Sequence, residues 1–174
     1  AMIRGHQWDE FIRKVPVKKG DFFQINPGCV HAIKGGTLIL ETQQSSDITY
    51  RVYDYDRLSD GKPRQLHVEQ SIATIEAPFK EASCDTFTEK IPGAVHTHLI
   101  TCPFYSVDKY EIDGMFTREF SRFFANVSVI SGKGYVNGIP LETGQHFIVP
   151  AGAGELRFEG KMSVICSNPE SGTL

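Results

Sequence analysis

Residues 20–57 read GDFFQINPGCVHAIKGGTLILETQQSSDITYRVYDYDR, and this stretch decides the predicted fold. Short β-prone runs alternate in it with turns such as NPG and KGG. In the run TLILET, alternate residues face opposite sides of a strand, which separates Glu41 from its apolar neighbour Leu40. Many short strands that are bounded by glycine and proline turns predict a sandwich or barrel.

The remainder of the chain extends this pattern. Two segments, 6–14 and 66–75, have helical character, and SDGKP at 59–63 predicts a turn. From HTHLIT onward the chain is again β-prone, and GKGYVNG predicts a hairpin because Asn-Gly tolerates positive φ. We therefore predict an all-β fold with one or two short helices. Its expected parts are a first unit (1–76), a connector (77–97) and a second unit (98–174).

Composition excludes several classes of protein. The 174 residues are 40% hydrophobic and 22% charged, with a net charge of −3, which is ordinary for a soluble globular protein. We expect no nucleic-acid partner, since there is no basic excess, and no membrane association, since no apolar run approaches about 18 residues. The four cysteines form no CxxC pair, which predicts reduced thiols in the cytoplasm.

A faint internal repeat relates the two predicted units. KKGDFFQINPGCVHAI and ETGQHFIVPAGAGELRF align with an offset of about 124 residues. The matched pairs are Gly20 with Gly144, Phe23 with Phe147, Ile25 with Val149, and Gly28 with Gly152. His31 falls on Glu155, so the scaffold occurs twice and the histidine once. The pattern predicts chemistry in the first unit and a structural role for the second.

A strand–PxG–xHA–strand pattern, followed by LETQQSSDITYRVYDYDR, closely resembles the short bacterial form of class I mannose-6-phosphate isomerase. The resemblance is most specific over 19–57. It implies a cupin fold of two jelly-roll units, the first one incomplete. It also implies a zinc-dependent aldose–ketose isomerase that interconverts mannose 6-phosphate and fructose 6-phosphate by metal-assisted proton transfer through a cis-enediol.

The resemblance also implies a zinc ligand at His31. The family binds zinc through a Gln-x-His pair, a Glu and a late His, and His31 stands at the last of these positions. The other ligands would precede residue 1, so the chain resembles the C-terminal portion of the enzyme. Catalytic zinc normally has three protein ligands, so we expect this chain alone to be inactive. Without the resemblance, a histidine hydrogen-bonded to a backbone carbonyl is the commoner reading.

Three further residues are candidates for the substrate site. Arg51 stands at the family's catalytic arginine, where a cation would stabilise the enediolate; the alternative is an ion pair with Asp54 or Asp56. Asp47 would bind sugar hydroxyls or orient Arg51, or else cap a turn. Glu41 would line the pocket or act as a partner of His or Arg, and the general base stays unassigned.

Three other features have metal-ligand character but different predicted roles. Gln65-Leu-His67 has Gln-x-His form, yet it opens a predicted helix. His96 and His98 share one strand face, but no Glu follows within 101–105, so we predict a structural pair. Cys29 is predicted to be a buried thiol.

A second functional hypothesis is a non-catalytic cupin that binds sugar phosphates or serves in assembly. Under either hypothesis the expected ligand is a sugar phosphate. Missing strands would leave unpaired edges and apolar surface, so we expect self-association.

Overall fold

A computed structural model describes residues 2–46, 48–120 and 123–170. The chain divides into two compact units, residues 1–82 and 83–174, which are described separately. The predicted all-β class is confirmed: antiparallel strands dominate, with two short helices, α1 (Trp8–Phe11) and α2 (Val68–Thr74). Neither helix of the described chain is long and apolar enough to cross a membrane.

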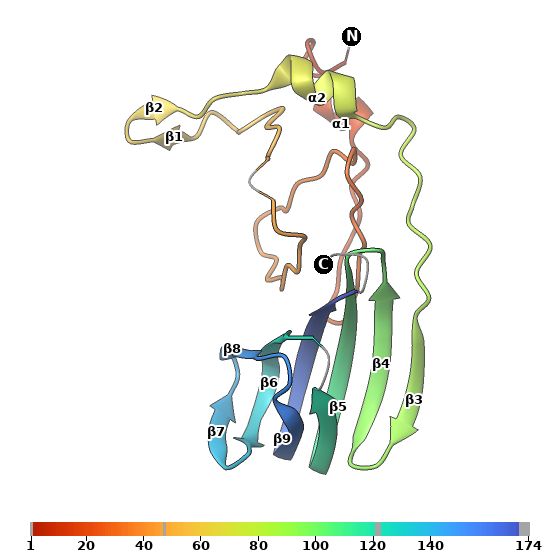
Figure 1. Ribbon diagram of the computed structural model, residues 1–174. Helices are drawn as coiled ribbons and strands as arrows, with labels where there is room; N and C mark the ends of the chain where they lie inside the picture. The colour runs from red at the N-terminus through yellow and green to blue at the C-terminus, as the bar shows by residue number, and fades with distance from the viewer. Residues whose placement is uncertain (1, 47, 121–122, 171–174) are drawn as a thin grey trace. The chain divides into compact units, whose positions relative to one another are not determined.

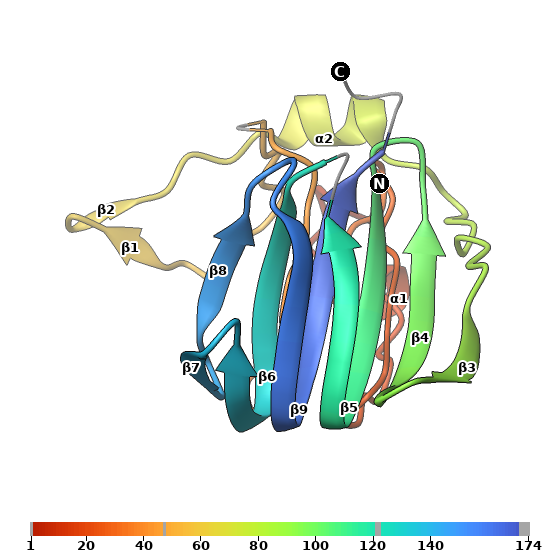
Figure 2. The same ribbon diagram turned by 60° about the horizontal axis from the view of Figure 1, so that its bottom comes forward.

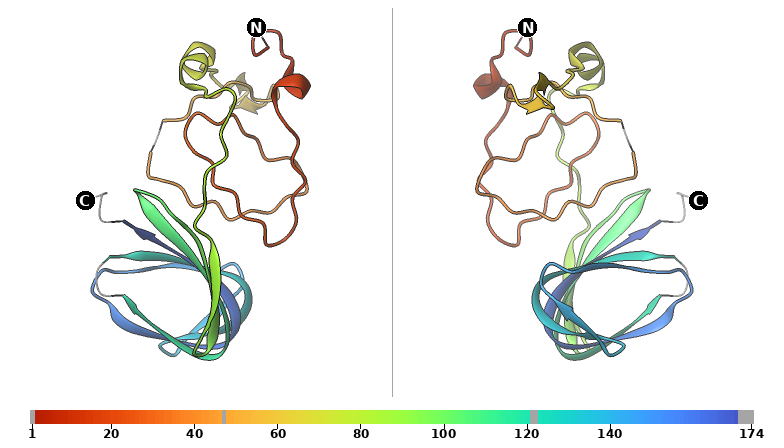
Figure 3. Two further views of the ribbon diagram at one scale, coloured as in Figure 1. Left: turned by 90° about the vertical axis from the view of Figure 1, so that its right-hand side faces the viewer. Right: turned by 90° about the vertical axis from the view of Figure 1, so that its left-hand side faces the viewer.

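The second unit is a curved antiparallel sheet, whose strands curl into a barrel-like wall in the views of Figure 3. The strand order is β3-β4-β5-β9-β6-β7, and β8 pairs with β6. The strands are β3 (Phe87–Ile91), β4 (Ala94–Thr101), β5 (Tyr105–Phe120), β6 (Ala125–Val136), β7 (Ile139–Glu142), β8 (His146–Val149) and β9 (Gly154–Pro169). We predicted a connector over residues 77–97, but this range contains β3 and the first half of β4, which both belong to the sheet because they pair antiparallel in register.

The central ladder joins two long strands (Figure 1). β5 and β9 pair over their whole length, from Tyr105 opposite Pro169 to Phe120 opposite Gly154. Figure 2 shows β9 between β5 and β6. Because side chains alternate across a strand, one face of these strands lines an apolar interior. Its most deeply buried side chains are Phe158, Val127, Val129, Val164 and Cys166.

The predicted hairpin at 132–138 is confirmed. β6 and β7 pair up to Val136 opposite Ile139, which leaves Asn137 and Gly138 as a two-residue turn. Both turn residues have positive φ, 45° and 80°, as a type I′ turn requires. Asn137 also accepts a hydrogen bond from the Arg157 backbone N–H through its side-chain oxygen, at 2.8 Å. The Asn-Gly pair therefore sets the register of this edge.

In the first unit the two helices lie within the predicted segments. The predicted turn at 59–63 is a small hairpin of β1 (Leu58–Ser59) and β2 (Lys62–Pro63). Trp8, the first residue of α1, stacks on Tyr53 with ring centroids 5.1 Å apart. The stacking and the hairpin give this unit local order, although its sheet is only two residues long on each side.

The prediction of strands within 20–57 is wrong, because none of the described residues in this range takes part in a β-ladder. The internal repeat shows the physical reason. Gly20 and Gly28 have φ of 97° and 87°, close to 89° and 75° at their counterparts Gly144 and Gly152. Between the second pair of glycines, β8 hydrogen-bonds to β6. The first copy keeps these turns but has no partner strand among the described residues.

The lack of a partner leaves apolar side chains exposed in the first unit. Ile25 is 42% exposed, whereas its counterpart Val149 is 3% exposed. Other large apolar residues that stay exposed in this stretch are Phe23, Ile33, Leu38, Ile39, Leu40, Ile48 and Tyr50. Exposed apolar, strand-like segments are characteristic of interaction surfaces and of aggregation.

We predict that the 174-residue chain self-associates through this stretch. Leu38→Lys combined with Ile48→Lys should shift the sedimentation distribution toward monomer, because added charge opposes apolar contact and edge pairing. The matched control is Ile139→Lys in the second unit, because Ile139 is 63% exposed, close to the 69% of Ile48. A wild-type chain that sediments as a monomer at high concentration would contradict the prediction.

Candidate functional site

His31 follows a turn that is hydrogen-bonded to the chain just after the end of α2. The backbone carbonyl of Gly28 accepts a hydrogen bond from the Glu76 N–H at 3.1 Å. A Cβ at residue 28 would lie 2.9 Å from Glu76 Cγ and 3.0 Å from the Thr74 carbonyl oxygen, at a φ of +87°. Only glycine meets both constraints without strain. The PxG turn is therefore anchored three residues before the histidine.

The His31 side chain is exposed, and its Nδ1 lies 3.0 Å from the Cys29 carbonyl oxygen. A carbonyl only accepts, so Nδ1 carries the proton and Nε2 of a neutral imidazole is left with its lone pair. A backbone carbonyl on one ring nitrogen is a common way to orient a metal-ligating histidine. Both predictions for His31, a carbonyl-bonded imidazole and a ligand, are compatible with this geometry.

Arg51 is held by the segment that leads into α2. Its Nη1 donates to the Gln65 carbonyl oxygen at 3.2 Å. Its backbone N–H donates to His67 Nδ1 at 3.2 Å, and its carbonyl accepts from the His67 N–H at 2.8 Å. His67 is the N-cap residue of α2, so the Gln65–His67 segment opens a helix, as predicted. The His67 imidazole accepts a hydrogen bond from the Arg51 backbone N–H.

Asp54 lies among three arginine side chains of this unit. From the sequence it was expected only as an alternative ion-pair partner of Arg51. Its buried carboxylate accepts two hydrogen bonds from the guanidinium of Arg64 and one from Arg57 at 2.8 Å. Arg51 Nε lies 3.8 Å from Asp54 Oδ1. The hydrogen bonds from Arg64, and then those from Arg57, outweigh burial and lower the pKa of Asp54 below its ordinary value of 3.8.

The expected site residues are not joined into one cluster. Among the described residues, no hydrogen bond or ion pair connects His31, Glu41 and Arg51. Glu41 is exposed, and Asp47 lies outside the described residues. Glu41 and Asp47 come from segments predicted as a strand and its following turn, and the strand lacks a partner here. The convergence of these side chains stays a prediction.

The described residues around His31 do not form a complete zinc site. Among the described His, Cys, Asp and Glu side chains, one group is close enough to share a metal ion, and His31 is not part of it. That group is His96, His98 and Asp108 in the second unit. A catalytic zinc normally needs three protein ligands, so the described residues around His31 do not fit the ion without further donors.

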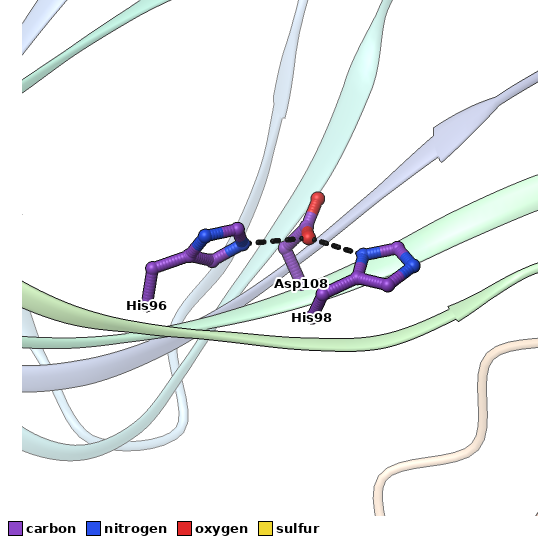
Figure 4. Close-up of side chains that lie close together, drawn as sticks. All are labelled: His96, His98 and Asp108. Carbon is purple, nitrogen blue, oxygen red and sulfur yellow. Dashed lines mark hydrogen bonds and ion pairs between the residues drawn. The ribbon is translucent and has the colours of Figure 1, made fainter. Parts of the chain in front are cut away.

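His96 and His98 lie on β4 and point toward one carboxylate, Asp108 of β5 (Figure 4). His96 Nε2 and His98 Nδ1 are each 2.8 Å from Asp108 Oδ1. Burial lowers the pKa of His96, but its hydrogen bonds to Asp108 and Glu89 outweigh burial, and the net shift is upward from 6.5. No Glu follows the pair within 101–105, but Asp108 reaches both histidines from the neighbouring strand, opposite His98 in the register.

Comparison with known proteins agrees with this architecture. Residues 95–169, which cover most of the curved sheet, match a family model described as mannose-6-phosphate isomerase, cupin domain. The class of fold is therefore a cupin. The chain is 42% identical to the mannose-6-phosphate isomerase ManA of Bacillus subtilis over 97% of its length, and 40% identical to the mannose-6-phosphate isomerase of Streptococcus mutans over 96%. The chain is therefore similar, along nearly its whole length, to mannose-6-phosphate isomerases.

The structural match extends over both units. The crystal structure of the mannose 6-phosphate isomerase from Bacillus subtilis superposes with a TM-score of 0.90 at 36% identity, over 95% of this chain and 55% of that one. The chain likewise covers 55% of ManA and 54% of the Streptococcus relative. It spans about half the length of the curated relatives that it matches.

The Asp54 cluster predicts acid-sensitive stability of the first unit. A lowered pKa means that the carboxylate stabilises the folded unit above pH 3.8, and this contribution disappears as the pH falls through the lowered pKa. Asp54→Asn should lower stability at pH 7 and flatten the loss seen from about pH 5 downward. The fluorescence of Trp8, the single tryptophan, reports the unfolding of this unit.

The neighbouring carboxyl provides the control for that measurement. Asp56→Asn removes an exposed side chain of the same type, two residues further along. It should leave the acid profile close to that of the wild type. Equal effects of the two substitutions would contradict the role given to Asp54.

Proposed function

We propose that the chain is the C-terminal part of a mannose-6-phosphate isomerase. The observation that carries this proposal is the 42% identity to ManA along nearly the whole chain, together with coverage of only 55% of that relative. The complete enzyme would interconvert mannose 6-phosphate and fructose 6-phosphate by moving a proton between C1 and C2 through a cis-enediol. The cytoplasmic location expected from the cysteine pattern is part of this proposal.

In the complete enzyme, this chain would supply three kinds of group. His31 would give one imidazole, through Nε2, to a zinc site whose other ligands lie outside these 174 residues; the proton on Nδ1 supports that assignment. Arg51 would stabilise the negative charge of the enediolate. A fixed cation in a site closed to water is effective because it needs no reorganisation during the reaction. Glu41 and Asp47 would line the sugar site.

The geometry around Arg51 is consistent with such a role. Its guanidinium is held by one hydrogen bond to a carbonyl and by a loose ion pair at 3.8 Å, and the side chain is 26% exposed. Asp54 meanwhile makes closer contacts with Arg57 and Arg64. Asp54 therefore leaves Arg51 with positive charge to offer to an anionic substrate.

The partner that completes the first unit would be a strand-donating segment from the other half of the enzyme. The repeat supports this, because β8 is ordered by pairing with β6, whereas residues 22–25 have no equivalent neighbour among the described residues. Pairing would supply hydrogen-bond partners to the backbone and cover the exposed apolar side chains. Formation of these strands would also fix the directions of His31 and Glu41.

A chimaera tests the proposal. The chain alone should show negligible isomerase turnover. Replacing the matching part of Bacillus subtilis ManA with these 174 residues should give an active enzyme. In that chimaera, Arg51→Ala should lower kcat/KM by about 100-fold to 1,000-fold, the usual cost of removing one group that stabilises transition-state charge.

Arg13→Ala is the matched control, since Arg13 is an exposed arginine in the same unit and pairs with Glu81. It should leave kcat/KM nearly unchanged. Turnover by the isolated chain would overturn the expected inactivity. A folded chimaera that binds a sugar phosphate without turnover would favour the alternative, a non-catalytic cupin module.

A further inference from the structure

The His96–His98–Asp108 cluster lies in the second unit and contains none of the residues assigned to the proposed isomerase site. The three side chains come from adjacent strands, and one potential ligand atom from each lies within 4.8 Å of the others. Both imidazoles direct one nitrogen at the same carboxylate oxygen, Asp108 Oδ1, at 2.8 Å. With bonds of about 2.1 Å, adjacent ligand atoms stand about 3 Å apart around an octahedral ion and about 3.4 Å apart around a tetrahedral one. The two close separations therefore need little adjustment to admit an ion.

Each imidazole is also oriented from its outer side. His96 Nδ1 lies 3.0 Å from Glu89 Oε1, on the far side of the ring from Asp108. His98 Nε2 lies 3.1 Å from Thr101 Oγ1 and 3.4 Å from Asp85 Oδ1. Metal-ligating histidines characteristically donate their second ring N–H to such an outer partner, which fixes the tautomer and the ring direction. The cluster shows this arrangement at both histidines.

Aromatic contacts hold the two rings in place. His96 stacks on Tyr110 with centroids 4.8 Å apart and an interplanar angle of 7°. Phe87 stacks on His98 at 5.2 Å and meets His96 edge-on at 5.6 Å. His98 and Asp108 are buried, and the His96 side chain is 14% exposed. A site held this rigidly loses little entropy when a ligand binds.

The two oxygens of Asp108 have different neighbours. Oδ1 faces the histidines, while Oδ2 lies 3.5 Å from Arg118 Nη2. Arg118 itself lies over the rings of Tyr110 and Phe120, with its Cζ 4.9 and 5.0 Å from their centroids. Its positive charge opposes a nearby cation. However, by facing Oδ2 it leaves Oδ1 available as the single carboxylate ligand.

We propose that His96, His98 and Asp108 bind a divalent transition-metal ion in the second unit, through two imidazole nitrogens and one carboxylate oxygen. Imidazole and carboxylate donors together suit zinc, cobalt or iron, and three protein ligands leave coordination positions open. The ion would replace two protons, one in the hydrogen bond between His96 and Asp108 and one in the hydrogen bond between His98 and Asp108. The site is separate from the zinc site proposed at His31.

The alternative is a purely structural network, in which Asp108 joins two histidines by hydrogen bonds and binds no ion. The two accounts differ in a direct measurement. After treatment with a chelator and its removal, the 174-residue chain is titrated with Co²⁺, whose visible absorption depends on its ligands, and with Zn²⁺ in a calorimeter. We expect one equivalent of each ion to bind per chain and Zn²⁺ to displace Co²⁺.

Substitutions assign the binding to these residues. Asp108→Asn and His98→Gln keep the side-chain volume and should abolish saturable binding. Glu89→Gln changes an exposed outer partner and should weaken binding by about 10-fold to 100-fold, the usual effect of such partners, while the fold is retained. His146→Ala, which removes an exposed histidine on β8 of the same unit, should change neither stoichiometry nor affinity.

Three outcomes would overturn the proposal. The first is a folded wild-type chain, verified by circular dichroism, that binds neither ion saturably. The second is binding that survives intact in folded Asp108→Asn or His98→Gln. The third is binding that is lost in His146→Ala but unchanged in Glu89→Gln, which would place the ion elsewhere. Should the first two variants fail to fold, the wild-type and Glu89→Gln titrations still decide the question.

Discussion

The backbone ladder between neighbouring strands is the interaction on which this structure depends. β5 and β9 pair in register along 16 residues, so that alternate residues exchange backbone hydrogen bonds, and β6 pairs with the opposite edge of β9. These ladders allow one face of each strand to bury its apolar side chains. Where the partner strand is missing, as at residues 22–25, the same kind of sequence keeps its turns but forms no sheet. Strand pairing therefore separates the second unit, which is an extended sheet, from the first unit, in which residues 22–25 form no ladder.

The two units also place polar groups differently. In the second unit, imidazoles and a carboxylate project from formed strands, so their positions follow from the register of β4 and β5. In the first unit, the best-fixed polar group is Asp54, held by arginines close to it in sequence. Short-range ion pairs can form without a sheet, whereas a site built from several strands cannot. The contrast explains why the polar cluster of the second unit joins residues from two strands, whereas the described hydrogen bond of His31 is to a carbonyl two residues away.

Local signals in the sequence predicted local structure well. The Asn-Gly turn, the 66–75 helix and the helix-opening place of His67 each depend on a few adjacent residues, and each is confirmed. The second unit's strands were mostly predicted, because their apolar alternation matches the interior of a curved sheet with one buried face. The strands of 20–57 were not correctly predicted, since the sequence shows strand propensity but cannot show whether a partner is present. Asp108 was missed as the third member of its cluster because the contact crosses between strands.

Amide hydrogen exchange tests the central claim most directly, which is that residues 22–25 and 37–41 of the first unit lack a strand partner. In the isolated chain these amides should exchange rapidly, while those of β5 and β9 stay protected. In the chimaera with the other half of Bacillus subtilis ManA, both segments should become protected to the level of β8. Strong protection of residues 22–25 in the isolated chain, or its absence in a folded chimaera, would contradict this account.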